Sequence, residues 1–487
     1  MKPITAAYIL LVLGIVHTAK QVQAGGLNIT NDAGSPVHNT IAICHVQGTI
    51  KYAAGPEAHA AEYNGRYLAV GNGGYAGTID NYTMLTHLNS GFAVGGCDSG
   101  HHINENGNNT GFAPYMNDPA KVEAWIHDSI ALTTRVARDT ITMRYYNHLP
   151  KHSYYYGCLT GGGQGYSLAE FYPQLFDGVV AEGPRNYYSH LVLSFLWNQQ
   201  HTIEGKTGFM DQGVLDFVTR EVLDACDAID GVEDRVIENP LRCDFDIGRL
   251  ECRPGQIASN ETTCLTSEQV TAARYIYSGA KDARDGKQVY PGFNFGAEPG
   301  WLSQQTSLFN SYGAPILRQL VFNNAEYDAV ANFNWGSDLD AVYSLASPLI
   351  DGISTNLSAF HARGGKLITA QGWSDPINAA TWPMRHMSDI ADVMGKQTVD
   401  EFMRLFMIPG GGHCGANAAY PHVPAEYHVL DALVEWVEKG TVPDDGVLSS
   451  APPDGSNTTR RLCPWPSQAV FVGGDEMDWM SYECAVA

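Results

Sequence analysis

The chain has 487 residues, of which 44% are hydrophobic and 17% are charged, and its formal net charge is −23. This length and composition are typical of one large globular domain, or of two fused domains, with a substantial core. Nucleic acids and anionic membranes attract basic surfaces, so the strongly acidic balance argues against both as partners.

The beginning of the chain predicts a signal peptide. Lys2 supplies a positive charge, residues 6–16 form a short apolar run, and residues 22–24 offer a cleavage site before Gly25. A buried helix is the alternative, which the short length and terminal position disfavour. No other stretch reaches the roughly 20 apolar residues that a membrane-spanning helix needs. The sequence therefore predicts a secreted protein without a membrane span.

Cysteines and glycosylation motifs agree with secretion. The ten cysteines are an even number, which favours disulfides in an oxidising compartment. The sequence has no Cys-x-x-Cys motif of the kind that binds zinc. Asn-x-Ser/Thr motifs predict N-glycosylation. They lie at Asn28, Asn81, Asn108, Asn260, Asn356 and Asn457.

Strands and helices alternate along the first third of the chain. Asp118 and Pro119 mark a helix start as N-cap and first helical residue. Such alternation implies a parallel sheet covered by helices. From about residue 195 to 346 the pattern breaks down, which suggests an insertion. The expected strands are residues 66–70, 92–94, 153–157, 178–181, 366–370 and 404–408.

The strand predicted at residues 153–157 leads into the pattern of a nucleophile elbow, Gly-x-Ser-x-Gly. The framing glycines are Gly157 and Gly161, but the central position, where the attacking hydroxyl belongs, holds Leu159. Asp375 and His413 follow, each just beyond a predicted strand, in the order nucleophile, acid and base of α/β-hydrolases. They are the candidate acid and base, since a carboxylate that orients an imidazole is the proton-transfer part of acyl-transfer sites.

Taken together, these segments resemble the fungal tannase and feruloyl esterase family. The resemblance implies an α/β-hydrolase fold with an inserted lid domain, acting on aromatic or phenolic carboxylic esters. It divides the chain into a signal peptide (1–24), a hydrolase core (25–194 and 347–487) and a lid insertion with a calcium loop (195–346). The matching motifs are residues 64–68, 71–77, 98–101, 156–165, 176–181, 372–376 and 409–415.

The resemblance also implies a disulfide between Cys158, which precedes the nucleophile position, and Cys414, which follows His413. Such a bridge would lock the elbow to the histidine loop. It makes Cys158 a poor substitute nucleophile, and Thr160 and Ser167 are disfavoured by their expected directions. The remaining pairs expected are Cys226–Cys243, Cys252–Cys264, Cys463–Cys484 and Cys44–Cys97.

Three positions depart from the family pattern. Leu159 stands for serine, Gly163 for arginine, and Gln371 for the histidine that usually precedes Gly-Trp-x-Asp-Pro. Leucine has no group to deprotonate, so covalent serine catalysis fails at its first step. Gly73 and Gly74 match the glycine-rich loop that donates backbone N–H groups to a developing oxyanion.

A calcium site is expected in the insertion. Asp227, Asp230 and Asp234 lie within eight residues, and the resemblance adds the backbone carbonyls of Val232 and Val236. Hard oxygen donors around a glycine turn suit a structural Ca²⁺, and a solvated acidic turn is the alternative.

Two functional hypotheses follow. In the first, His413 and Asp375 remain a proton-transfer pair in an enzyme. That enzyme hydrolyses phenolic esters weakly, or performs a non-hydrolytic isomerisation or cyclisation of a phenolic metabolite. In the second, the pocket binds a small aromatic molecule without chemistry.

Overall fold

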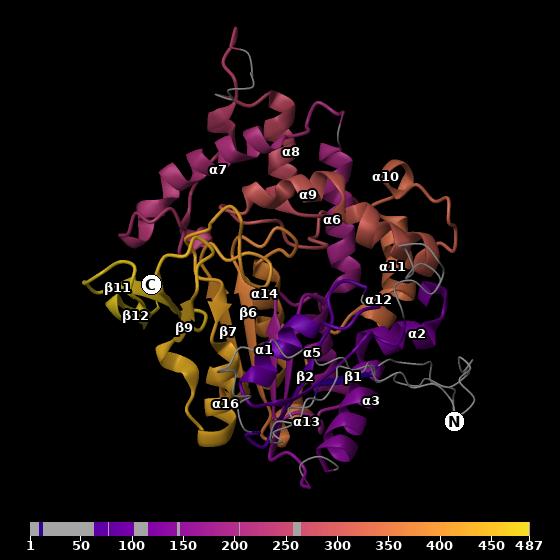
Figure 1. Cartoon of the computed structure of the whole chain (residues 1–487). Helices are drawn as coiled ribbons and strands as arrows, with labels where there is room; N and C mark the ends of the chain where they lie inside the picture. Colours follow the sequence, from indigo (N-terminus) through magenta and orange to yellow (C-terminus); the bar gives the residue numbers. More distant parts are fainter. Residues whose placement is uncertain are drawn as a thin grey trace, which may run out of the picture. The chain divides into compact units, whose positions relative to one another are not determined.

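The computed structural model describes residues 9–12, 63–75, 77–101, 115–143, 147–203, 205–256 and 264–486. Its main sheet has the strand order β1-β3-β2-β4-β5-β6-β7 (Figure 1). Strand β2 pairs in parallel with β3 and β4, whereas β1 is antiparallel to β3. The strands are β1 Ile9–Val12, β2 Arg66–Val70, β3 Ala93–Cys97, β4 His152–Cys158, β5 Gly178–Glu182, β6 Lys366–Gly372 and β7 Met403–Ile408.

Each strand expected from the sequence is present, as β2 to β7, so the predicted α/β fold class is confirmed. The additional strand β1 lies within the predicted signal peptide. The contacts divide the chain into two compact units. The first is Met1–Ala181 with Gly352–Leu367, and the second is Glu182–Asp351 with Ile368–Ala487.

In the first unit, the helix that begins after Asp118 follows the sequence closely. The Asp118 side chain accepts a hydrogen bond from the Ala120 N–H at 3.1 Å, as expected of an N-cap. The helical segments that continue from it bury Trp125 and Ile130. The helices are α1 Asn81–Asn89, a 3₁₀ turn Tyr115–Asn117, α2 Pro119–Glu123, a π-helix Ala124–Asp128, α3 Ser129–Arg135, a π-helix Val136–Ile141, α5 Thr160–Phe171 and α13 Ser358–Ala362.

The second unit contains the stretch predicted as an insertion, residues 195–346, and the described part of this stretch is largely helical. Its described residues add no strand to the main sheet. Side chains of α7 and α8 belong to one hydrophobic core. The helices in or overlapping this stretch are α6 Tyr188–Thr202, α7 Gln212–Cys226, α8 Ser267–Ser278, α9 Trp301–Thr306, α10 Ala329–Asn332 and α11 Ser337–Leu345, with π-helices Phe309–Gly313 and Ile316–Val321 and 3₁₀ turns Asp227–Asp230, Pro240–Arg242, Ile247–Leu250 and Glu298–Gly300.

The rest of the second unit adds helices and two small antiparallel sheets, β8–β9–β10 and β11–β12, that the sequence did not reveal. They are α12 Ser347–Ile350, α14 Thr381–Met394, α15 Lys396–Phe402, α16 Val429–Lys439, 3₁₀ turns Pro443–Asp445 and Trp479–Ser481, and strands β8 Glu426–Tyr427, β9 Val447–Ser450, β10 Arg460–Leu462, β11 Gln468–Phe471 and β12 Tyr482–Ala485. Tyr420 and Val423, beyond the predicted lid boundary at residue 346, share one hydrophobic core with the insertion.

The predicted disulfides are largely confirmed in the described residues. Disulfides join Cys226–Cys243, Cys252–Cys264 and Cys463–Cys484. Among the described residues Cys97 forms no disulfide, and burial raises the pKa of its thiol to about 11. Its predicted partner Cys44 lies outside the described residues, so that pairing stays a prediction.

Three predicted glycosylation sites, Asn81, Asn356 and Asn457, are exposed. The others, Asn28, Asn108 and Asn260, lie outside the described residues. None of the helices in the described ranges combines the length and apolarity that a membrane crossing requires.

A buried carboxyl group joins two segments of the second unit by hydrogen bonds. Glu298 is fully buried and accepts hydrogen bonds from the Tyr277 hydroxyl at 2.7 Å and from the Gly296 N–H at 2.9 and 3.0 Å. Burial raises the pKa of Glu298 to about 7. Tyr420 donates to the Gly296 carbonyl at 2.7 Å, which joins this turn to the C-terminal part of the unit.

We expect Glu298→Gln to remove a pH dependence of stability. Because the folded-state pKa is raised, the wild-type carboxyl stabilises most below pH 4.5, and that contribution declines as the pH rises to about 7. Glutamine does not ionise. The free energy of unfolding of the variant, relative to that of the wild type, should therefore rise by roughly 3 kcal/mol between pH 4 and pH 8. Urea unfolding at both pH values measures this, and parallel stability curves for the two proteins would contradict it.

Candidate active site

The elbow predicted after β4 is present as a sharp turn between β4 and α5. Leu159 occupies the turn with φ 64° and ψ −120°, a conformation that is strained for a residue other than glycine. A Cβ at Gly157 would lie 2.4 Å from the Gly161 carbonyl oxygen, and one at Gly161 would lie 3.0 Å from the Asn72 oxygen. Both framing positions therefore require glycine.

Leu159 is a buried hydrocarbon at the position where this kind of turn presents a nucleophile. Its exposed fraction is 9%, and its Cδ2 lies 3.8 Å from where a Cβ on Gly73 would stand. The leucine side chain therefore faces the predicted oxyanion loop, and it offers no proton-bearing group.

Polar side chains hold that glycine loop in place. The Thr160 hydroxyl donates to the Gly74 carbonyl at 2.7 Å, and the Trp125 indole N–H donates to the same oxygen at 3.3 Å. Gln164 accepts a hydrogen bond from the Asn72 N–H at 3.1 Å. Thr160 thus supports the loop, which is a structural reason against its being a substitute nucleophile. Ser167 is fully buried within α5.

The candidate base and acid are hydrogen-bonded to each other. His413 Nδ1 lies 2.8 Å from Asp375 Oδ2, and Asp375 Oδ1 accepts the N–H groups of Ile377 at 2.8 Å and Asn378 at 3.1 Å. Burial alone would raise the pKa of Asp375, but His413 and these backbone donors hold it below its usual range. Asp375 is therefore an ionised carboxylate suited to orient His413 and to stabilise its protonated form.

Gln371, which the sequence marked only as a departure from the family pattern, contacts the His413–Asp375 pair directly. Its Nε2 donates to Asp375 Oδ2 at 3.0 Å, so it shares that oxygen with His413. On the other side of the imidazole, His413 Nε2 is buried and has no hydrogen-bond partner among the described residues. This nitrogen is the one that would exchange a proton with a reacting group.

The insertion supports the acid loop. Gln304 in α9 donates to the Pro376 carbonyl at 2.7 Å and accepts from the Asn198 amide at 3.0 Å. Gly300 packs so closely that a Cβ there would lie 2.1 Å from Pro376 Cβ. The position of Asp375 therefore depends on residues of the insertion.

A second serine, histidine and aspartate cluster, missed in the sequence, lies at the start of α6. Ser189 Oγ lies 2.9 Å from His190 Nδ1 and 2.6 Å from Asp351 Oδ2, and the Ser189 N–H donates to Asp351 at 2.8 Å. Ser189 is fully buried. Because Asp351 binds both the N–H and the hydroxyl of Ser189 in the first turn, this cluster is a cap of α6.

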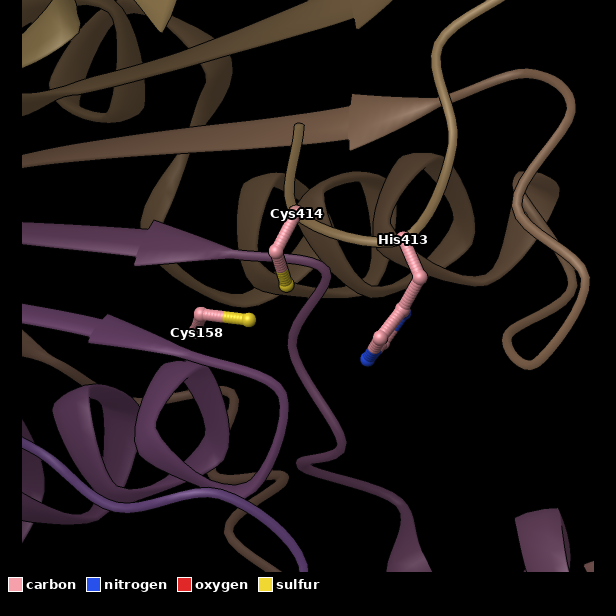
Figure 2. Close-up of side chains that lie close together, drawn as sticks. All are labelled: Cys158, His413 and Cys414. Atoms are coloured by element: carbon pink, nitrogen blue, oxygen red, sulfur yellow. The ribbon is translucent and has the colours of Figure 1, made fainter. Parts of the chain in front are cut away.

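The cysteines beside the candidate base are disulfide-bonded. Figure 2 shows the side chains of Cys158, His413 and Cys414 close together, and both cysteines are in disulfides, as predicted. Thiolates bind metals and oxidised sulfurs do not offer that charge, so this group is no metal site.

The predicted calcium residues offer carboxylate oxygens, the donor type that hard cations such as Ca²⁺ prefer. Burial and the charge of Asp234 raise the pKa of both Asp227 and Asp230, so the carboxylates repel one another. Asp234 is paired with Arg460 at 2.5 Å, and within the described chain the three carboxylates do not gather within 4.8 Å. Val232 packs against Cys463 and Tyr482, and the Val236 N–H donates to Asp227 at 3.1 Å.

A parallel sheet, a positive-φ turn between strand and helix, and a histidine–aspartate pair after later strands define the class of α/β-hydrolases. Comparison with known proteins gives the family. The profile described as tannase and feruloyl esterase matches residues 45–485, so the chain belongs to the tannase and feruloyl esterase family of carboxylic ester hydrolases.

Individual relatives support the same family assignment. A probable feruloyl esterase B-1 of Aspergillus flavus is 31% identical over 448 residues, which cover 87% of this chain and 81% of the relative. The crystal structure of feruloyl esterase B from Aspergillus oryzae superposes with a TM-score of 0.78 at 29% identity, covering 87% of this chain and 85% of that one. A tannin acyl hydrolase from Aspergillus niger shares the fold, with a TM-score of 0.72, 22% identity, and coverage of 87% and 81%.

We expect non-reducing peptide mapping to recover Cys158 linked to Cys414. Replacing both by alanine should lower the free energy of unfolding by roughly 5 kcal/mol, because the bridge closes a very long loop in the unfolded chain. Removing Cys252–Cys264, with a sequence separation of 12, is the matched control and should cost roughly 3 kcal/mol. Free thiols at residues 158 and 414 would contradict the pairing.

Proposed function

We propose that this protein acts on aromatic or phenolic carboxylic esters by general-base catalysis, without a covalent acyl-enzyme. The observation that carries the proposal is an intact His413–Asp375 pair in a chain whose elbow holds a buried leucine. The names of the relatives, feruloyl esterase and tannin acyl hydrolase, support the substrate class. Packing among Tyr187, Tyr290 and Trp382 supplies aromatic surface in the same unit as the pair.

In the proposed mechanism, His413 Nε2 takes a proton from a water molecule while the water oxygen attacks the ester carbonyl carbon. Asp375 stabilises the resulting imidazolium, and the N–H groups of Gly73 and Gly74 donate to the oxyanion. When the tetrahedral intermediate collapses, the bond between the carbonyl carbon and the alkoxy oxygen breaks. The imidazolium then returns its proton to the departing alcohol, which leaves a carboxylic acid.

The test is incubation of the unmodified protein with a panel of phenolic esters, followed by mass spectrometry of the products and of the intact protein. Hydrolysis that disappears in His413→Ala, without any acylated protein at steady state, supports the proposal. An acylated protein would reveal an overlooked nucleophile. Products with the substrate's own mass would favour the isomerase or cyclase alternative, and binding without products would favour a binding protein.

We expect the Leu159→Ser variant to hydrolyse phenolic esters at least about 100-fold faster than the unmodified protein, because it restores the attacking hydroxyl at the nucleophile position of the elbow. The variant should also show an acylated intermediate by intact mass. Leu159→Ala is the matched control, since it shortens the side chain without adding a hydroxyl. The double variant Leu159→Ser with His413→Ala should lose the gain. Equal rates for Leu159→Ser and Leu159→Ala would contradict the assigned site.

We also propose that Asp227, Asp230 and Asp234, with the Val232 and Val236 carbonyls, bind one structural Ca²⁺. Burial first, and then repulsion by Asp234, raise the pKa of Asp227 and Asp230, and a cation bound between the carboxylates would offset both effects. Arg460 competes for Asp234, so calcium binding would require this side chain to share or release the carboxylate. The ion lies outside the reaction and would hold the turn in shape.

Chelation should therefore lower the melting temperature by roughly 2–4 °C, and added calcium should restore it. The double variant Asp227→Asn with Asp230→Asn should lose this response. Asp224→Asn is the matched control, because Asp224 is exposed at the end of α7 and pairs with Arg235 outside the proposed set. An unchanged melting temperature after chelation, with no calcium by elemental analysis, would rule out the site.

Secretion is proposed from the predicted signal peptide together with the disulfides. Three disulfides with assigned partners, and two further disulfide-bonded cysteines at residues 158 and 414, are typical of an oxidising compartment. Exposed Asn81, Asn356 and Asn457 are accessible to glycosylation. N-terminal sequencing and glycopeptide mapping of protein from the culture medium test both points.

A further inference from the structure

Arg185 is a buried cation that has no counterion in the part of the chain that the structure describes. It follows β5 by three residues, and only 3% of its surface is exposed. Other arginines of this unit, such as Arg284 and Arg460, pair with aspartates, whereas Arg185 forms no ion pair with any described residue. The free energy of burying an isolated charge is high, so an unpaired buried guanidinium requires an explanation.

The unpartnered atoms lie together on one edge of the guanidinium. Nε and Nη2 have no hydrogen-bond partner among the described residues, while Nη1 makes one long contact of 3.4 Å with the Tyr188 hydroxyl. The guanidinium carbon lies 4.9 Å from the ring centre of Tyr312 and 5.7 Å from that of Tyr188. These rings interact with the cation but do not accept its edge N–H groups. Nε–H and Nη2–H point in parallel, which matches the two oxygens of a carboxylate.

This edge belongs to the surroundings of the candidate base and acid. Gly183, two residues before Arg185, lies against His413, since a Cβ on Gly183 would stand 3.3 Å from His413 Cε1. Burial raises the pKa of Tyr290, the Asp375 charge raises it further, and Arg185 lowers it. Asp375 and Arg185 thus act on the pKa of the same tyrosine in opposite directions, and the contact of Gly183 with His413 gives the geometric link between this part of the chain and the candidate base.

We propose that Arg185 binds a carboxylate of the ligand, so that the preferred substrates are aromatic esters that carry a second, free carboxylate group. This inference rests on the proposed function and narrows its substrate class. In a chain with 52 acidic and 29 basic residues, a cation that pairs with no carboxylate of the described residues is available to an anionic ligand. A planar carboxylate would accept from Nε and Nη2 at once and would neutralise the buried charge.

A tyrosine in a helix of unusual geometry lies beside Arg185. The half-buried Tyr312 ring covers one face of the guanidinium, and Nε and Nη2 are closed off from water. Tyr312 lies in the π-helix Phe309–Gly313, a type of segment that is frequent at functional sites. A ligand carboxylate would therefore reach the Nε–Nη2 edge only after neighbouring side chains had shifted.

The experiment compares binding of 4-hydroxybenzoate and 4-hydroxybenzamide to the unmodified protein by isothermal titration calorimetry at pH 7. The amide has the same shape but lacks the charge and one acceptor. We expect the carboxylate to bind at least ten-fold more tightly to the wild type and equally tightly as the amide to Arg185→Met. Arg185→Lys should keep only part of the preference, because an ammonium lacks the parallel N–H groups. Arg220→Met removes an exposed arginine that stacks on Phe217, and this control should leave the preference unchanged.

A preference that survives in Arg185→Met and Arg185→Lys would overturn the inference, as would the absence of any preference in the wild type. Inorganic phosphate that displaces 4-hydroxybenzoate with similar affinity would also overturn it, since the site would then be an unspecialised anion site. Because binding is measured on the unmodified chain, the result is independent of whether Leu159→Ser gains hydrolysis. A failure of the proposed chemistry and a failure of this ligand assignment are therefore separate outcomes.

Discussion

The backbone contact between Gly157 and Gly161 is the constraint on which the elbow depends. With only 2.4 Å between a Cβ at the first glycine and the carbonyl oxygen of the second, no side chain fits, and the chain must turn sharply from β4 into α5. This turn forces the residue between them into positive φ, a conformation that costs on the order of 1–3 kcal/mol for a non-glycine residue. Leu159 is subject to this strain without supplying the hydroxyl for which such turns are built. The surrounding contacts, including Thr160 to Gly74, keep the geometry when the reacting group is absent.

Sequence reasoning predicted the parts of the fold that local chemistry determines. Apolar runs specified the strands β2 to β7, and Asp118 marked the helix start, because these signals come from neighbours in the chain. The small sheets β8–β10 and β11–β12 were missed because their strands are short and their pairing joins distant residues. Asp375 and His413 were found as candidates from their places after strands, and the structure adds their hydrogen bond.

The unpredicted parts of the site are contacts between side chains far apart in the sequence. Nothing local marks Gln304 as a donor to Pro376, since the two are 72 residues apart. Gln371 was visible as a departure from a pattern, but its hydrogen bond to Asp375 depends on the turn that brings both together. Arg185 carried no signal at all, because an arginine is notable only once its burial, and the lack of a partner among the described residues, are known.

The contacts of α9 with the loop that carries Asp375 limit how the substrate preference of this protein can change. An insertion joined to a hydrolase core through flexible linkers is exchangeable, because substrate preference changes with the cover while the reacting groups stay in place. Here Gly300 and Gln304 contact Pro376, the residue directly after Asp375, so α9, the turn before it and the acid share one packing arrangement. Exchanging this helical segment for a foreign one would displace the carboxylate, and new specificities are more accessible through substitutions within the existing helices than through exchange of the whole segment.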